Sequence, residues 1–148
     1  MTLYFLHKVP ITLEFCGIKY YNFIIVIHQN EKTETIMNCV FCKIIDGSIP
    51  SKKVYEDDKM VAFYDLEPQA PVHVIMIPKA HIESANDLNS ENSAYVAHIF
   101  SKVPEIAKSL GLSDGYRIVN NCGSDAGQTV FHIHFHLLGG KKLENKMA

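Results

Sequence analysis

Three histidines alternate with apolar residues near the C-terminal end of the chain, in the run FHIHFHL. If this run is a β-strand, His132, His134 and His136 share one face, with neighbouring imidazoles about 6.6–7 Å apart. We expect three imidazoles in register to carry chemistry rather than packing, because they would repel one another if all were charged. The residues between them would fill the opposite face and anchor it in a core: Phe131, Ile133, Phe135 and Leu137.

Two kinds of chemistry fit such a face. Alternate imidazoles can converge on one metal ion. The same array suits phosphoryl chemistry, in which one imidazole attacks phosphorus while its neighbours orient it and donate protons. The segment 121–129 (NCGSDAGQT) favours the second kind, because a loop rich in Gly, Ser and Asn offers amides and hydroxyls to phosphate oxygens.

Five strands are predicted to position these groups. The apolar and β-branched runs are short, and the pair Asp57-Asp58 reads as a tight turn between the first two. The third run ends at Pro78, and its near-continuous apolar character indicates a buried strand. The predicted strands are 54–56, 60–66, 72–77, 115–121 and 130–138.

Two helices complete the pattern. A short one covers 40–45 and ends before Gly47. A long one covers 88–110, with Asn89 or Ser90 as its cap, a bend at Pro104 and an end at Gly111. Its apolar stripe has helical spacing and comprises Tyr95, Ile99, Val103, Ile106 and Leu110. Short strands interrupted by one long helix predict an α+β fold on an antiparallel sheet.

The composition indicates one domain. The chain has 148 residues, 47% of them hydrophobic, and a formal net charge of −2. A duplex-binding protein usually carries a broad positively charged surface, which a net charge of this size does not indicate. We therefore expect no nucleic-acid partner. The four cysteines have no disulfide-framework spacing.

The first 36 residues have a different character from the rest. Their longest apolar run, 20–27, has eight residues and is too short for the roughly 18–20 that span a bilayer. No small-residue cleavage site follows it, so we expect no secretory signal, no membrane partner and a cytoplasmic protein. We expect residues 1–36 to be an extension, with Met37 as the working start, and residues 37–148 to form the domain.

A second cluster of potential ligands begins at Cys39. Cys39 and Cys42 form a CxxC pair, for which redox, metal-binding and incidental interpretations are all open. Zinc requires two more ligands, and His81 is a candidate. Neither the preceding strand nor the long following helix of a thioredoxin-like site is visible in the sequence.

The C-terminal run resembles the motif of the histidine triad family, in which three histidines alternate with apolar residues. Its HIHFHLL segment, 132–138, fits that pattern at every position. Upstream, the segment from Cys39 to Ile82 is similar to the N-terminal half of the family's nucleotide-binding, phosphoramidase-type branch. The resemblance covers about residues 38–140.

The resemblance implies a nucleotide hydrolase or nucleotidyl transferase. It would act at the α-phosphorus of purine nucleoside phosphoramidates or related AMP conjugates, through a nucleotidyl-histidine intermediate. The implied fold is an α+β domain that forms a homodimer with a larger continuous sheet. Two alternatives stay open: a dinucleoside polyphosphate hydrolase, and a non-catalytic nucleotide-binding or scaffolding dimer.

The resemblance also implies roles for individual residues. His134 would be the nucleophile, and His136 and His73 would contact the phosphate oxygens or the departing group. Asp65 would hold the ribose hydroxyls. The other implied substrate contacts are the phosphate and ribose contacts Asn121, Gln128 and Thr129 and the apolar base wall of Phe41, Ile44, Ile49, Phe63 and Leu66.

Some bacterial-type members of the family bind a structural zinc, and no organic cofactor is implied. The matching ligand positions here are Cys39, Cys42, His81 and His132. One departure from the branch is the tail KKLENKMA after Gly139-Gly140, which lacks an aromatic, Pro-rich segment. For this reason the preference for a leaving group cannot be carried over from the family.

Overall fold

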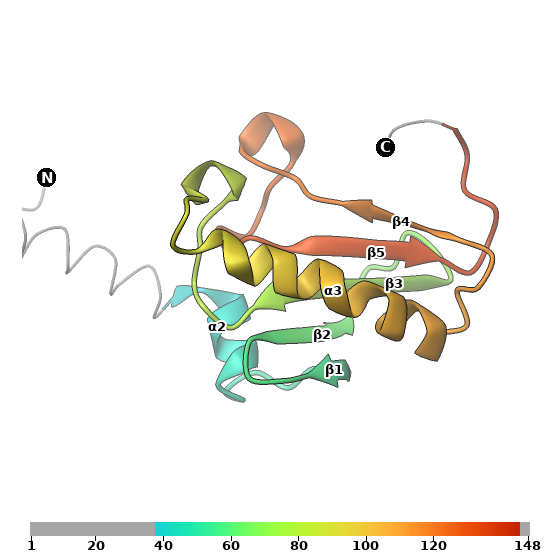
Figure 1. Cartoon of the computed structure of the whole chain (residues 1–148), viewed down its shortest axis with the longest axis horizontal. Coiled ribbons are helices and arrows are strands. Elements are labelled where there is room, and N and C mark those ends of the chain that lie inside the picture. Colours follow the sequence, from blue (N-terminus) through green and yellow to red (C-terminus); the bar gives the residue numbers. More distant parts are fainter. Residues whose placement is uncertain (1–37, 146–148) are drawn as a thin grey trace, which may run out of the picture. The chain divides into compact units, whose positions relative to one another are not determined.

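The structure is a computed structural model that describes residues 38–145 (Figure 1). The expected division at Met37 and the predicted extension 1–36 lie outside these residues. Within the described range, the chain builds one antiparallel sheet with α3 lying across one of its faces.

The sheet has five strands in the order β1-β2-β3-β5-β4. All four neighbouring pairs are antiparallel, which confirms the predicted α+β fold on an antiparallel sheet. The last strand in sequence, β5, lies between β3 and β4. The strands are β1 (Lys53–Glu56), β2 (Met60–Tyr64), β3 (Val72–Pro78), β4 (Tyr116–Val119) and β5 (Phe135–Gly139).

Alternate residues of the buried strands feed two apolar clusters, one on each face of the sheet. The helix α3 (Ser93–Ser109) packs on the first face and the short helix α2 (Val40–Ile45) on the second. The first cluster includes Met60, Ala62, Val74, Met76, Ile99, Val103, Ile106, Ile133, Phe135 and Leu137. The second includes Phe41, Ile44, Val61, Phe63, Ile75 and Ile77.

The prediction for α2 is confirmed at both ends. The helix covers the predicted residues, and its cap Asp46 is followed by Gly47 with φ of +85°. That left-handed conformation is strained for residues with a β-carbon, so glycine stops the helix at this point.

The long helix is shorter than predicted. It begins at Ser93 rather than Leu88, because the Asn89 side chain accepts hydrogen bonds from the amides of Glu91 and Asn92 and holds a turn there. Neither Asn89 nor Ser90 caps the helix. A 3-10 turn, η1 (Ala85–Asp87), precedes this segment. The predicted apolar stripe is confirmed, since its three central residues are buried and its two ends pack against the core.

The last strand is also shorter than predicted. It begins at Phe135, so His132 and His134 precede it in irregular structure, and Phe131 is 55% exposed instead of buried. The side chains still alternate: Ile133 enters the α3-side core, whereas the rings of His132 and His134 contact Phe41 of α2. The prediction that all three histidines lie on one continuous strand is therefore wrong, although successive side chains still point to opposite faces.

The other strand predictions differ only at their ends. The strand predicted to reach Leu66 stops at Tyr64, because the Asp65 carboxylate accepts a hydrogen bond from the Glu67 amide and forms a turn. The strand predicted for 115–121 is confined to β4.

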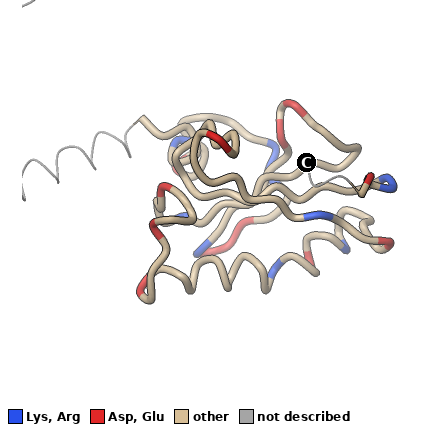
Figure 2. Tube along the Cα trace, turned by 90° about the horizontal axis from the view of Figure 1, so that it is seen from above, with Lys and Arg blue, Asp and Glu red and all other residues tan. Residues whose placement is uncertain are grey.

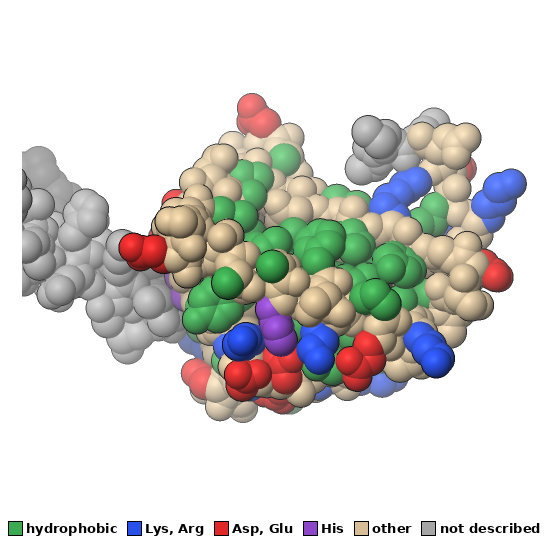
Figure 3. Space-filling view, viewed as in Figure 1, with side chains coloured by type: hydrophobic (Ala, Val, Ile, Leu, Met, Phe, Trp, Pro, Cys, Tyr) green, Lys and Arg blue, Asp and Glu red, His purple; other side chains and the backbone are tan. Residues whose placement is uncertain are grey.

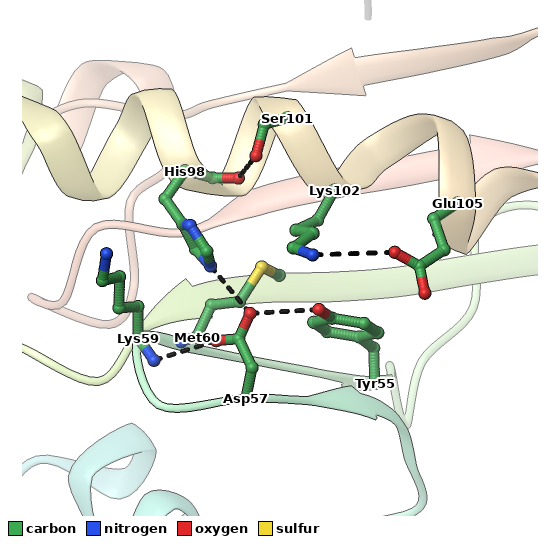
Figure 4. Close-up of polar contacts among 8 residues, drawn as sticks. All are labelled: Tyr55, Asp57, Lys59, Met60, His98, Ser101, Lys102 and Glu105. Atoms are coloured by element: carbon green, nitrogen blue, oxygen red, sulfur yellow. Dashed lines mark hydrogen bonds and ion pairs between the residues drawn. The ribbon is translucent and has the colours of Figure 1, made fainter.

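The turn between β1 and β2 is fastened to α3 through one carboxylate. Asp57 accepts hydrogen bonds from the amides of Lys59 and Met60, from the Tyr55 hydroxyl at 3.0 Å and from His98 Nε2 at 2.7 Å (Figure 4). These donors hold the pKa of the Asp57 carboxyl well below its usual range against the opposing effect of its partial burial. Asp57 therefore ties the start of the sheet to the helix above it.

Charge and hydropathy of the described part agree with the composition. Acidic and basic residues are interspersed around residues 38–145, without a long track of one sign (Figure 2). No helix among the described residues is long and apolar enough to cross a membrane.

Candidate active site

The three predicted catalytic histidines meet on the face of the sheet that carries α2. His73 comes from β3, His136 from the neighbouring strand β5, opposite Ile75, and His134 from the segment just before β5. The His136 ring centroid lies 5.0 Å from that of His73 and 5.1 Å from that of His134. Phe41 of α2 covers His134 at 5.3 Å. The structure thus brings together three imidazoles that come from two strands and the segment before one of them.

Hydrogen bonding assigns the tautomer of His134. Its Nδ1 lies 2.7 Å from the main-chain oxygen of His132, which can only accept, so Nδ1 carries the proton. The other nitrogen, Nε2, is left with its lone pair. His134 is only 5% exposed, so this lone pair is held in a partly desolvated environment. Such an imidazole is suited to nucleophilic attack.

A second chain of bonds assigns His73 and His136. The Gln69 amide donates to His73 Nδ1 at 3.1 Å, which places the His73 proton on Nε2. This nitrogen lies 2.8 Å from His136 Nδ1, which therefore accepts. The proton of His136 is then on its own Nε2, and His136 is poised as a donor.

Asp65 lies next to this pair. Its Oδ2 is 3.3 Å from His73 Nε2 and 4.0 Å from His136 Nδ1, while its Oδ1 accepts from the Glu67 amide at 2.8 Å. The predicted ribose ligand is thus beside His73 and His136, with one oxygen bonded within its own turn.

Burial keeps His73 and His136 neutral. Desolvation lowers the pKa of His73, with the nearby Asp65 carboxylate opposing the shift. Desolvation, with repulsion from His134 and His73, lowers the pKa of His136 to about 4. At neutral pH the ligand-free histidines therefore bind one another as neutral donors and acceptors rather than repelling as cations.

Four potential metal ligands meet nearby. The thiols of Cys39 and Cys42 and ring nitrogens of His81 and His132 all lie within 4.8 Å of one another. His132 is fully buried, and its Nε2 donates to the Pro78 carbonyl at 2.9 Å, which leaves the Nδ1 lone pair facing the thiols. The structure therefore brings together the four residues that the sequence predicted as a set.

The spacing of these atoms fits a tetrahedral shell. Cys42 Sγ is 3.3 Å from His81 Nδ1 and 3.6 Å from His132 Nδ1, and Cys39 Sγ is 3.6 Å from His132 Nδ1. Zinc bound at ordinary distances would separate a sulfur ligand from a nitrogen ligand by about 3.6 Å. Burial, and then the neighbouring Cys39, raises the pKa of Cys42 to about 12. A pair of thiolates here therefore needs a cation beside it.

The loop before the histidines is held by Gln128. This side chain is 5% exposed, donates to the carbonyls of Glu83 and Val130, and accepts from the Gly123 amide. Its amide is occupied within the loop, so its predicted phosphate contact stays a prediction. Asn121 is half-buried and Thr129 is exposed on the same loop, which includes the 3-10 turn η2 (Ser124–Ala126).

The predicted base wall is only partly assembled. Phe41, Ile44 and Phe63 are buried in one cluster with Ile49 packed against it, and the Phe41 and Phe63 rings are 5.7 Å apart. Leu66 stands apart from them in the turn after β2 and is 97% exposed. The structure does not bring Leu66 into this wall.

A family model described as "Scavenger mRNA decapping enzyme C-term binding" matches residues 38–148. Protein HitA of Neisseria gonorrhoeae is 46% identical over 102 residues, which are 69% of this chain and 95% of the relative. The chain belongs to the histidine triad family. Two solved histidine triad structures also resemble it, and both are covered almost completely.

The first of these histidine triad structures is a HIT family hydrolase from Legionella pneumophila Philadelphia 1. It has a TM-score of 0.73 and 46% identity, and the match covers 75% of this chain and 100% of that one. A histidine triad protein from Clostridium difficile has a TM-score of 0.72 and 50% identity, covering 74% and 96% of the two chains. The chain is thus a hydrolase-like histidine triad protein.

Two contacts in this histidine triad site were not predicted from the sequence. Asn120 donates from Nδ2 to the main-chain oxygen of His134 at 2.8 Å, and the Gln69 amide assigns the His73 tautomer. The doublet Asn120-Asn121 at the end of a strand could have drawn attention to Asn120. A main-chain donor such as Gln69 leaves no trace in residue type.

Proposed function

We propose that this protein hydrolyses purine nucleoside phosphoramidates or related AMP conjugates at the α-phosphorus, through a nucleotidyl intermediate on His134. The observation that carries this proposal is the 2.7 Å hydrogen bond from His134 Nδ1 to the His132 carbonyl. It leaves Nε2 as a lone-pair nitrogen at a site shared with two further histidines. The family membership supports the same chemistry.

In the first step, His134 Nε2 attacks the α-phosphorus and the bond from phosphorus to the leaving nitrogen breaks. The departing amine needs a proton. We expect the bound anionic substrate to favour a second proton on the His136 ring, and the Nε2–H of this imidazolium then supplies the proton and leaves His136 neutral. The positive charge that forms on the His134 ring is stabilised by the hydrogen bond from Nδ1–H to the His132 carbonyl.

In the second step, water attacks the phosphorus of the nucleotidyl-histidine. His136, now lacking its Nε2 proton, accepts a proton from that water. The bond from phosphorus to His134 Nε2 breaks, AMP leaves, and both imidazoles return to their starting tautomers. His73 holds His136 in the required orientation through the 2.8 Å contact between Nε2 and Nδ1.

The nucleotide would lie across the histidine cluster and the apolar wall that includes Phe41. We expect Asp65 to hold the ribose hydroxyls, and Asn121 and Thr129 to contact ribose or phosphate at the histidines. The purine would lie against the apolar wall that includes Phe41.

We also propose a structural zinc at Cys39, Cys42, His81 and His132. The sulfur-to-nitrogen spacings of 3.3–3.6 Å and the lone pair of His132 support this assignment. A Cys2His2 set leaves no open position, so zinc there would stabilise the fold rather than take part in hydrolysis.

A homodimer with a continuous sheet completes the proposal. Apolar side chains gather over the face of the domain that carries α3 (Figure 3). Phe100 of α3 is 46% exposed and Tyr116 of β4 is 40% exposed. Since β4 pairs only with β5 in the described sheet, its outer edge is available to a second copy. Light scattering of the full-length protein measures this state directly.

Trapping the intermediate tests the proposed hydrolysis. Full-length protein is mixed with adenosine 5′-phosphoramidate, quenched and digested, and mass spectrometry locates the nucleotidyl group. We expect it on His134, and we expect His134→Ala to bind AMP but to lose at least about 10³-fold in turnover, as when other nucleophiles are removed. His98→Gln is the matched control. A label on another residue, or turnover that survives His134→Ala, contradicts the proposal.

A further inference from the structure

The nucleophile lies beyond the end of the sheet ladders. The pairing of β4 with β5 ends at Val119 and His136, and the pairing of β3 with β5 ends at Met76 and Phe135. The peptide groups at His134 therefore lack the regular strand partners that hold a catalytic residue inside a sheet. Something else has to fix the main chain at this position.

That role falls to Asn120. It directly follows the last residue of β4, is half-buried, and places Nδ2 at 2.8 Å from the His134 main-chain oxygen. Because a carbonyl oxygen can only accept, the nitrogen end of the amide must face it, which settles the orientation of the side chain. The Asn120 amide replaces the ladder bond that the irregular segment has lost.

The two bonds at His134 act on different parts of the residue. The His132 carbonyl sets the tautomer and the tilt of the imidazole ring, whereas Asn120 holds the peptide plane from which the side chain projects. If that plane rotates, Nε2 moves away from the line of attack and Nδ1 moves away from the His132 carbonyl that assigns its proton.

We propose that Asn120 is a positioning residue for the nucleophile His134. This inference rests on the proposed function, because it assigns Asn120 to the step in which His134 attacks phosphorus. Asn120 acts through the main chain of His134 and makes no contact with substrate in this account. A misplacement of about 1 Å in a reacting group can cost up to about 100-fold in rate, so a single hydrogen bond at this point has a large effect.

The chemistry of the amide dictates the substitutions. Asn120→Asp keeps the size of the side chain but turns an oxygen toward the His134 carbonyl oxygen, so that attraction becomes repulsion. Asn120→Ala removes the contact without adding repulsion. The matched control is Asn86→Asp, which makes the same change of charge on an exposed residue of η1.

The experiment uses the full-length protein and adenosine 5′-phosphoramidate. We expect kcat and the single-turnover rate of His134 labelling to fall about 10- to 100-fold in Asn120→Asp and less in Asn120→Ala. KM should stay within about twofold, because ground-state binding contacts are not touched. Asn86→Asp should behave as wild type. A general loss of folding would instead lower the active fraction and the melting temperature together.

The possible outcomes separate this inference from the proposed function. If Asn120→Asp turns over like Asn86→Asp, or if KM rises while kcat is kept, Asn120 is not a positioning residue. If wild-type protein has no turnover, the proposed function fails, and nitrogen NMR of the His134 ring decides the inference. A shift of His134 from the single Nδ1–H form to mixed tautomers in Asn120→Ala supports positioning, and an unchanged ring contradicts it.

Discussion

Two histidine–aspartate pairs in this domain have opposite surroundings. His98 and Asp57 lie between α3 and the β1–β2 turn, where the carboxylate receives four donors (Figure 4). His73 and Asp65 lie on the other face of the sheet, where the histidine has a second imidazole, His136, at 2.8 Å. In the first pair every bond ends on one carboxylate, whereas in the second the bonds run from one histidine to the next.

The difference shows that a histidine–aspartate pair can either hold two elements of the fold together or form a reactive group, depending on its hydrogen-bond partners. Asp57 is saturated by donors that hold its pKa low, so its charge is fixed and structural. At the second pair, burial lowers the pKa of both His73 and His136 and keeps them neutral. A neutral imidazole whose tautomer is assigned can move a proton, and a saturated carboxylate cannot.

The largest effect is expected from His136→Gln. The substitution removes the proton donor to the leaving amine, so kcat on adenosine 5′-phosphoramidate should fall by about 10² to 10⁴. His98→Gln, the same change at the other pair, should leave kcat unchanged. Equal losses in the two variants would remove the distinction between the pairs.

The next largest effect is expected in metal content, which depends on the tautomers assigned to the histidines. Protein purified without chelator should hold one zinc per chain, and Cys42→Ser should lose it together with about 2.7–4 kcal/mol of stability when free zinc is 100 to 1,000 times the Kd. His73→Gln should keep its zinc, because the proton on His73 Nε2 blocks that nitrogen as a ligand. Elemental analysis of the three proteins decides: a second zinc lost with His73→Gln would place a metal at Asp65, His73 and His136.

A smaller effect is expected from Asp57→Asn. The variant replaces a charged acceptor of four hydrogen bonds by a neutral one, so the free energy of unfolding should fall by about 1.5 kcal/mol while kcat is unchanged. Denaturant unfolding at pH 7 measures the loss. Stability equal to that of wild type would mean that the hydrogen bonds to Asp57, including the one from His98 of α3, contribute nothing to the free energy of unfolding.

The smallest effect is expected in how stability depends on pH, which should change differently when each of the two pairs is substituted. His136 has a pKa lowered to about 4 by burial, so between about pH 6.5 and 4 the unfolded chain takes up a proton that the folded chain does not. Stability should therefore fall over this range, and less steeply in His136→Gln. Asp57→Asn should leave this range unchanged and flatten only the loss below about pH 4, where the unfolded chain protonates this carboxyl before the folded chain does. Unfolding curves at half-unit pH steps test both parts.

The sequence predicted the elements better than their ends. The helix α2 and the positions of the strands along the chain were clear because apolar periodicity and Gly47 mark them locally. The start of α3 was missed because an Asn89 turn competes with the helix, and the start of β5 because alternation continues through residues that leave the ladder. Hydropathy reports which way a side chain faces, and it does not report whether the main chain is paired.

The candidate site was predictable to a similar degree. The four potential zinc ligands and the three histidines predicted to be catalytic were named from the resemblance to the histidine triad family, and the structure places each set together. The tautomers of His73 and His132 were not predictable, since they depend on main-chain atoms of Gln69 and Pro78. The exposure of Leu66 was missed because it follows from where β2 stops.

The strand order has a consequence for how the protein is made. Among the described strands, β4 has only β5 as a neighbour, and β5 is the last strand to leave the ribosome. Until residues 135–139 emerge, β4 has no partner among the described strands and His136 cannot lie beside His73. A nascent chain therefore completes its sheet and its reactive centre in the same event, and a product cut short before Phe135 has neither.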